Sequence, residues 1–404
     1  MIGGRTGSAS ILACLTRRQV GHTIGYHRTL RFGGTTFCPK TPMAEPRYLI
    51  IADGNFHPLE SKTANSVIRF HPDRCVAVLD RQTAGKTVQD VLGFGGAIPV
   101  VASIEEGLAK KPNAVMIGIA PAGGQLPDEW RGWLAKALET GCDLIGGLHT
   151  FLSDDPVLSA LAAKHGRTIY DARKAPKNLP IAAGLARLVD PFVVLTVGTD
   201  CNVGKMTAQL QLTAALKARG LKTNFVATGQ TGIFIEGWGT AVDAVVADFI
   251  AGAAEELVLK GKDADIVLVE GQGSINHPGY SGVTLGLLHG SCPDALILCH
   301  QATREHIGEY RTAPWLKIPP LARYVELYEM IGSAVHPTKV IGISLNTYDL
   351  SDDAAQEACR TAAAETGLPC TDPVRFDSAP LINAIVRERD NYLERKREAS
   401  RARV

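Results

Sequence analysis

The chain has 404 residues, a formal net charge of +1, and 45% hydrophobic and 21% charged residues. This length exceeds what one hydrophobic core usually holds, so we expect an ordinary globular protein of two domains. No apolar run reaches the roughly 20 residues that span a membrane, which argues against a membrane protein. The nine cysteines form no C-x-x-C pair, which argues against disulfide or zinc frameworks and favours a cytoplasmic location.

Residues 1–44 contain six basic residues and no acidic one, which leaves 36 basic against 41 acidic residues in the remainder. A net negative body argues against nucleic-acid binding. The leading segment has the Arg-rich, acid-free composition of a transit peptide. We favour the simpler interpretation that residues 1–44 are a disordered, non-native extension and that Met43 is the natural start.

Residues 45–185 alternate short apolar runs with helical patterns, which is typical of a parallel α/β sheet. Apolar residues at i, i+3, i+4, i+7 and i+8 from Trp130 predict a helix that ends at Gly141. No G-x-G-x-x-G follows the first predicted strand, so a dinucleotide site there has little support. We predict a Rossmann-like domain with strands at residues 48–52, 75–80, 113–120, 142–149 and 168–173.

The polar stretch 80–87 reads Asp-Arg-Gln-Thr-Ala-Gly-Lys-Thr and follows one of these strands. It resembles a phosphate loop without its leading glycine, and a polar strand-to-helix loop is the simpler interpretation. In the functional interpretation, Arg81 and Lys86 hold a substrate carboxylate at the carboxyl edge of the sheet. The Pro- and Lys-containing segment 174–191 that comes later is predicted to be a linker.

A β-branched run at residues 193–197 leads into the stretch 198–207, Gly-Thr-Asp-Cys-Asn-Val-Gly-Lys-Met-Thr. Strand, glycine-containing loop and helix in this order predict an anion site built from backbone N–H groups and a lysine. Met206 stands where the magnesium-binding hydroxyl of a P-loop is expected, and a thioether is a poor ligand for this hard cation. We therefore predict phosphate binding without magnesium-dependent hydrolysis.

Residues 191–385 are predicted to form a second, P-loop NTPase-like parallel α/β domain. A helix should follow the loop and end at Gly220, with further strands at residues 222–229, 264–271, 294–300 and 339–346. The tail 386–404 mixes Arg, Lys and Glu at high density, which is typical of a solvated helix or a frayed end.

Three polar turns follow strands of this second domain, so we expect them to share one crevice with the loop. Glu270 ends one apolar strand beside the loop and is the candidate acid. His289 and its neighbours His277, His300 and His306 include a candidate general base, although a lone histidine is more often a satisfied hydrogen-bonding residue. The candidate substrate-binding residues of these turns are Gln230, Thr231, Gln272, Ser274 and Arg304.

The loop resembles the Gly-Thr-Asp-Thr-x-Val-Gly-Lys-Thr loop of dethiobiotin synthetases, and Val269-Glu270-Gly271 resembles their Val-Glu-Gly. Met206 departs from that pattern. A closer resemblance covers most of residues 48–346, to a family catalogued as a domain of unknown function that includes D-glutamate N-acetyltransferases. The stretches that carry it are Gly-Lys-Met-Thr at 204–207, 241–249, 270–274, 282–286 and 287–290.

This resemblance implies acetyl transfer from acetyl-CoA to D-glutamate, with no metal required. Glu270 or His289 would be the base, N–H groups near Asn202 or Ser274 would stabilise the oxyanion, and cations would hold the carboxylates. Those cations are Arg81, Lys86 and Arg304. The residues expected to hold the cofactor are Gly198, Thr199, Asp200, Cys201, Asn202, Val203, Gly204, Lys205, Met206 and Thr207.

Two other classes stay open. The first is an ATP- and magnesium-dependent ligase or kinase of the dethiobiotin synthetase kind, in which Thr207 would replace the missing ligand. The second is a non-catalytic nucleotide-binding protein. The expected partner is a small amino acid, and we expect a homo-oligomer.

Overall fold

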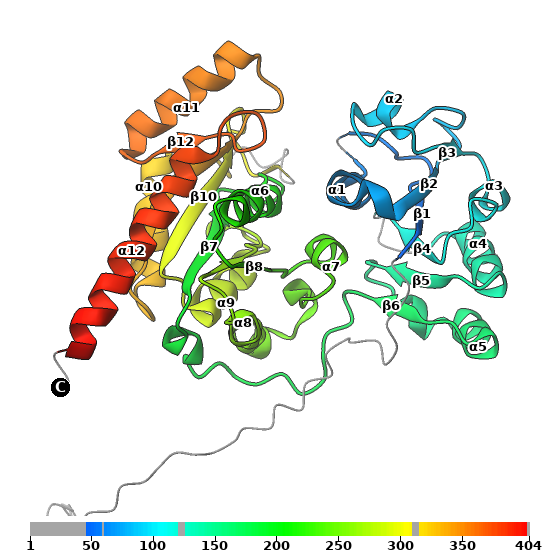
Figure 1. Cartoon of the computed structure of the whole chain (residues 1–404), viewed down its shortest axis with the longest axis horizontal. Helices are drawn as coiled ribbons and strands as arrows, with labels where there is room; N and C mark the ends of the chain where they lie inside the picture. The colour runs from blue at the N-terminus through cyan, green and yellow to red at the C-terminus, as the bar shows by residue number, and fades with distance from the viewer. Residues whose placement is uncertain (1–45, 59, 120–125, 309–314, 402–404) are drawn as a thin grey trace, which may run out of the picture. The chain divides into compact units, whose positions relative to one another are not determined.

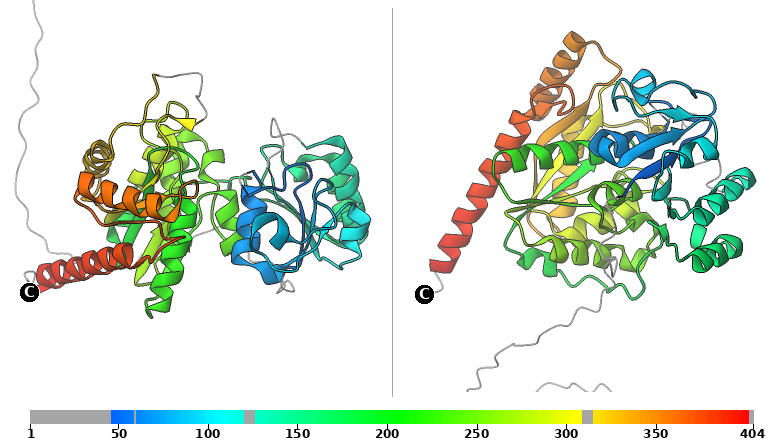
Figure 2. Two further views of the ribbon diagram at one scale, coloured as in Figure 1. Left: turned by 90° about the horizontal axis from the view of Figure 1, so that it is seen from above. Right: turned by 45° about the vertical axis from the view of Figure 1, so that its right-hand side comes forward.

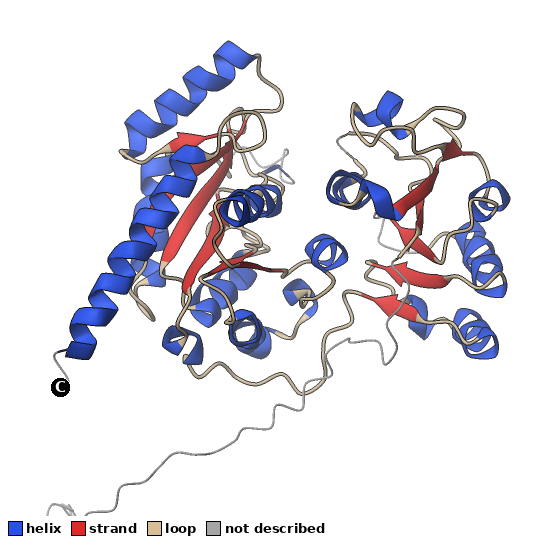
Figure 3. Cartoon of the chain, in the orientation of Figure 1, coloured by secondary structure: helices blue, strands red, loops and turns tan. Residues whose placement is uncertain are grey.

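The computed structural model describes residues 46–58, 60–119, 126–308 and 315–401 (Figure 1). The predicted extension at residues 1–44 lies outside them. The described residues form two α/β halves, each with its own parallel sheet, and both halves belong to one compact unit (Figure 3). The prediction of a Rossmann-like and a P-loop-like α/β fold is confirmed.

The sheet of the first half has the order β3-β2-β1-β4-β5-β6, which is the order of a doubly wound dinucleotide-binding sheet. β1 is buried on both faces because helices cover both sides, so its sequence is a continuous apolar run. The strands are β1 (Tyr48–Ile51), β2 (Cys75–Leu79), β3 (Val100–Val101), β4 (Ala114–Ile117), β5 (Asp143–Gly146) and β6 (Ile169–Asp171). The helices are α1 (Lys62–Phe70), α2 (Val88–Leu92), α3 (Ile104–Leu108), α4 (Asp128–Glu139) and α5 (Pro156–His165), with short 3-10 turns at Pro72–Arg74 and Leu152–Asp154.

The sheet of the second half has the order β12-β11-β10-β7-β9-β8. After β7 the chain forms β8 at one edge and β9 between β8 and β7, and then adds β10, β11 and β12 on the other side of β7. The loop after β7 therefore lies at a topological switch point. The strands are β7 (Phe192–Gly198), β8 (Thr223–Val226), β9 (Ile266–Val269), β10 (Ala295–Gln301), β11 (Lys339–Asn346) and β12 (Cys370–Thr371). The helices are α6 (Lys205–Ala218), α7 (Gln230–Glu236), α8 (Ala247–Gly261), α9 (Ser281–Ser291), α10 (Leu321–Gly332), α11 (Asp352–Thr366) and α12 (Ala379–Arg401), with 3-10 turns at Leu185–Leu188 and Val242–Ala244.

Alternate side chains of β7 point to opposite faces of this sheet. Val193, Leu195 and Val197 belong to a core with α8, α9 and α10. Phe192 and Val194 belong to a second core with α6 and α12. Figure 2 shows α12 in red along the sheet, where it contacts β11 and α6. The predicted charged tail therefore continues a helix whose first turns are buried.

Every predicted strand corresponds to an observed one, within a few residues at each end. The predictions missed β3 and β12, edge strands of two residues each, which are too short to leave a pattern. Among the described residues, no helix is both long enough and apolar enough to cross a bilayer.

Candidate functional site

The loop after β7 bends sharply enough to aim its backbone into the site. Asn202 and Gly204 both have left-handed backbones, with φ of 56° and 103°. Glycine adopts this conformation at no steric cost, which explains its place directly before α6. Lys205 then begins the helix, so the loop N–H groups and the helix N-terminus face the same space.

Three side chains fix the start of this loop. The hydroxyls of Tyr324 and Tyr328 on α10 donate to the carbonyls of Thr199 (3.0 Å) and Gly198 (2.7 Å). The Thr199 hydroxyl lies 2.8 Å from His300 Nδ1. Burial lowers the pKa of His300 to about 4, so its imidazole is neutral and supports the loop rather than adding charge to it.

Lys205 is almost fully buried, and its Nζ donates to the carbonyl of Asp200 at 2.7 Å. Burial lowers the pKa of Lys205. The Asp200 carboxylate accepts from Arg304 Nη1 (2.8 Å) and from the N–H of Gly308 (2.7 Å). The loop therefore keeps its shape through its own lysine, aspartate and a neighbouring arginine.

Glu270 follows β9, and its Oε2 accepts the N–H groups of Thr228 (2.9 Å) and Gly229 (3.1 Å). Burial raises the pKa of Glu270 to about 7, although these two N–H groups and the charges of Lys62 and Lys205 oppose the shift. A carboxyl with this pKa can hold or release a proton near neutral pH, which suits a general base.

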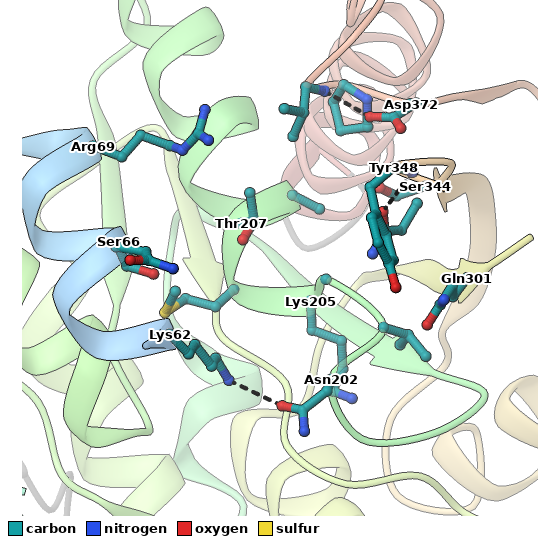
Figure 4. Close-up of a pocket in the computed structure, with 18 of the residues that line it drawn as sticks. Lys62, Ser66, Arg69, Asn202, Lys205, Thr207, Gln301, Ser344, Tyr348 and Asp372 are labelled. Carbon is teal, nitrogen blue, oxygen red and sulfur yellow. Dashed lines mark hydrogen bonds between the residues drawn. The ribbon is translucent and has the colours of Figure 1, made fainter. Parts of the chain in front are cut away.

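The loop and Glu270 line one cavity of about 730 Å³. Figure 4 shows the loop residues Asn202, Lys205 and Thr207 in it. Its walls come from both halves, because α1 of the first half lies against it together with the ends of β9, β10 and β11. Such a volume is typical of a small-molecule or cofactor site. Met206 and Thr207 also line this cavity, and Met206, which is only 5% exposed, belongs to the hydrophobic core of the first half as well.

Two other predicted residues, Gln272 and Arg304, line the cavity as well. Gln230 and Thr231 instead begin α7 at the contact between the halves, where Thr231 Oγ1 lies 3.0 Å from Thr63 Oγ1. Ser274 is fully buried and donates to Asn276 Oδ1 at 2.8 Å, so it does not face the cavity.

His289, the other residue predicted as a possible base, lies outside the cavity lining. It lies in the last turns of α9, which starts beside the Glu270 turn and leads away to the beginning of β10. Its Nε2 lies 3.1 Å from the carbonyl of Ile331 on α10, so it joins two helices. Glu270 is the base candidate that remains.

Arg81 and Lys86 are also outside the cavity lining. Arg81 is about half exposed and pairs with Asp53 (2.6 Å) and Glu129 (3.0 Å), so its charge is already balanced. The stretch that resembled a second phosphate loop ends at Thr87, which caps α2, a helix of only five residues. The simpler interpretation of that stretch, a polar strand-to-helix loop, fits the structure.

Asp200, Cys201 and His277 offer side-chain ligand atoms within 4.8 Å of one another. Such a set could hold a transition metal in principle. Both carboxylate oxygens of Asp200, however, already accept hydrogen bonds, from Cys201 N–H on one side and from Arg304 and Gly308 on the other. The group supports the loop.

The structure adds cavity residues that the sequence did not reveal. From the first half these include Lys62, Ser66 and Arg69 on α1. The second half adds residues near the ends of β11 and β12, which are Ser344, Asn346, Tyr348 and Asp372. The rule that ligands bind at the carboxyl ends of parallel strands could have found the latter group. No local pattern marks α1, because it reaches the site through the packing of the two halves.

The fold and the site define an α/β protein of two halves with a P-loop at the switch point of its second sheet. The description "Domain of unknown function (DUF1611_C) P-loop domain" matches residues 180–382, and "Domain of unknown function (DUF1611_N) Rossmann-like domain" matches residues 81–175. A D-glutamate N-acetyltransferase of Tritonibacter scottomollicae is 39% identical over 85% of this chain and 99% of its own length. A D-glutamate N-acetyltransferase of Pseudoalteromonas sp is 36% identical over 82% of this chain and 96% of its own length.

A crystal structure of a DUF1611 family protein from Anabaena variabilis is 44% identical, with a TM-score of 0.80 over 85% of this chain and 99% of that one. The chain therefore belongs to the DUF1611 family, the family of the two D-glutamate N-acetyltransferases. Among enzymes this places it with the acyltransferases, in an N-acetyltransferase role.

Proposed function

We propose that this chain transfers the acetyl group of acetyl-CoA to the amine of D-glutamate, with the P-loop holding the phosphates of CoA. The names of the two relatives support this reaction, since the chain matches nearly their whole length. The observation that carries the proposal is the shared cavity. It holds a carboxyl with a pKa of about 7 and a phosphate loop with methionine in place of the metal-binding hydroxyl.

The pyrophosphate of CoA would bind the loop N–H groups, the start of α6 and Lys205, which supply positive charge without a metal ion. Thr207 would donate to a phosphate oxygen from the next position on the helix. Lys205 would leave the Asp200 carbonyl to reach the phosphate. The pyrophosphate is bound but not cleaved, so this reaction does not require the magnesium-binding hydroxyl that Met206 replaces.

The flexible pantetheine arm would fold back along the cavity and bring the thioester to Glu270. The Glu270 carboxylate takes a proton from the ammonium group of D-glutamate, and the free amine attacks the thioester carbon. The tetrahedral intermediate then collapses as the C–S bond breaks, and the second proton of the attacking nitrogen passes to the departing sulfur, so CoA leaves as the thiol. N–H groups of the loop near Asn202 would stabilise the oxyanion.

The substrate carboxylates need cations that face the cavity. Lys62 meets this requirement, because it lines the cavity and its Nζ lies 3.4 Å from Asn202 Oδ1. Arg304 lines the cavity too, although its guanidinium already serves Asp200 and Cys201. Lys62 thus takes the role that the sequence suggested for Arg81 and Lys86.

The test is a panel of D- and L-amino acids with acetyl-CoA, following free thiol and the acetylated product together. We expect N-acetyl-D-glutamate to form in equal amount to the thiol, and L-glutamate to react far more slowly. Thiol release that is the same with and without any amino acid would mean simple thioester hydrolysis and would contradict the proposal.

A further inference from the structure

One face of α1 carries a stripe of polar side chains toward the cavity. Lys62, Ser66 and Arg69 follow one another at i, i+4 and i+7, so they share a face of the helix. The opposite face, with Ala64, Val67 and Ile68, is fully buried in the core of the first half. Figure 4 shows the stripe across the cavity from the α6 residue Thr207.

The Lys62 end of the stripe lies beside the phosphate loop. Lys62 lies within hydrogen-bonding distance of Asn202 at the tip of the loop. Its charge also acts on Glu270 and on Lys205, since it lowers the pKa of both. An anion bound by the loop would therefore be close to Lys62.

The Arg69 end carries a cation that has no acidic partner among the described residues. The guanidinium of Arg69 lies over the ring of Phe94, 4.1 Å from its centroid, and both residues line the cavity. Within the described part of the chain, its guanidinium makes no ion pair or hydrogen bond. Arg375, in contrast, donates to Leu350 O at 2.8 Å and pairs with Asp352, and Arg304 serves the loop. The ring orients Arg69 while its donors stay available.

The spacing of the stripe suits a ligand with two anionic groups. Seven residues of α-helix separate the Cα atoms of Lys62 and Arg69 by about 10 Å, and both side chains are long enough to shorten or lengthen that span. A guanidinium binds a phosphate through two parallel hydrogen bonds, which a lysine cannot do. The ligand of the proposed function carries a pyrophosphate and, on the same ribose, a separate phosphate monoester.

We propose that Arg69 binds the 3′-phosphate of CoA, while the loop after β7 binds the pyrophosphate. This inference rests on the proposed function. It makes the Rossmann-like half part of the cofactor site and predicts that the enzyme distinguishes acetyl-CoA from acetyl-3′-dephospho-CoA.

The test compares these two thioesters with the wild-type enzyme and with Arg69→Gln. Hydrogen bonds to a charged group contribute enough for about a 10- to 100-fold preference of the wild type for acetyl-CoA in kcat/KM. Arg69→Gln should lose that preference by reacting more slowly with acetyl-CoA only, while the rate with the dephospho compound is unchanged. Lys164→Gln, an exposed residue of α5 in the same half, is the matched control and should keep the preference.

An equal loss with both thioesters, or a rise in the KM for D-glutamate alone, would assign Arg69 to another group and overturn the proposal. A wild-type enzyme without preference would overturn it too. If the wild type reacts with neither thioester, the proposed function is wrong. Isothermal titration calorimetry then tests separately whether Arg69 binds a phosphate. Adenosine 3′,5′-bisphosphate should then bind the wild type at least 10-fold more tightly than AMP, and equally tight binding would contradict the assignment.

Discussion

Glu270 is a buried carboxyl whose environment differs strongly from that of a free amino acid. It is 3% exposed and held by two backbone N–H groups, yet its pKa is raised to about 7 because burial outweighs them. Nearby positive charge from Lys62 and Lys205 keeps the pKa from rising further. At neutral pH this carboxyl can gain or lose its proton with little cost, and this is what the proposed reaction requires.

The rate should therefore depend on pH through Glu270. The carboxylate is the active form, so kcat/KM should rise as pH rises through about 7 and then level off. Glu270→Gln should lower kcat by about 10²- to 10⁴-fold and remove this limb of the profile. Steady-state kinetics from about pH 5.5 to about pH 8.5 measure both effects. An unchanged profile in the variant would exclude Glu270 as the base.

Lys205 supplies the only side-chain cation of the loop itself. Lys205→Ala should weaken CoA binding by about 1.5–3 kcal/mol, the usual contribution of a hydrogen bond to a charged group. Isothermal titration calorimetry measures the change, and circular dichroism serves as the control for folding. Unaltered affinity in a folded variant would remove the loop from cofactor binding.

At the scale of elements, Glu270 is fixed by the start of α7. The N–H groups of Thr228 and Gly229 bind its carboxyl, and Gly232 leaves room for it one turn later. A Cβ atom on Gly232 would lie 2.5 Å from Glu270 Oε2, closer than any ordinary contact. The glycine is thus required by the position of the carboxyl.

Gly232→Ala should displace Glu270 and lower kcat by about 10²-fold, with little change in the KM for acetyl-CoA. Gly282→Ala is the matched control, because a Cβ on Gly282 of α9 meets open space. Its kcat should equal that of the wild type. Normal kcat in Gly232→Ala would mean that the position of Glu270 does not limit the reaction.

The sequence predicted those parts of the site that depend on neighbouring residues in the chain. Gly204 and Lys205 follow an apolar run and begin an amphipathic helix, and Glu270 ends another apolar run. These local patterns were enough to place the loop and the acid together. The sequence could not show that His289 lies outside the cavity lining, because tertiary packing sets the direction in which the last turns of α9 run.

At the scale of the whole molecule, the two halves share a hydrophobic core. Met206, Phe225 and Phe234 of the second half belong to the same buried cluster as the strands of the first half. His71 Nε2 lies 2.8 Å from the carbonyl of Ile235, which adds a polar contact between them. The first half therefore contributes Lys62 and Arg69 to the site through packing between distant segments, which no local sequence pattern could predict.

A shared core predicts that the halves unfold together. Differential scanning calorimetry should show one transition. Phe234→Ala should lower the free energy of unfolding by about 3–5 kcal/mol, and the transition should stay single. Two separate transitions in the wild type would mean that the halves are independently stable, and the site would then depend on their docking.

We expect the loop to hold CoA for acetyl transfer without a metal ion. The most direct measurement is thiol release from acetyl-CoA with D-glutamate in excess EDTA, repeated with ATP added. We expect full activity in EDTA, and ATP should at most compete with acetyl-CoA for the loop. Activity that stops in EDTA, returns with Mg²⁺ and produces ADP from ATP would contradict this account and identify a ligase or kinase instead.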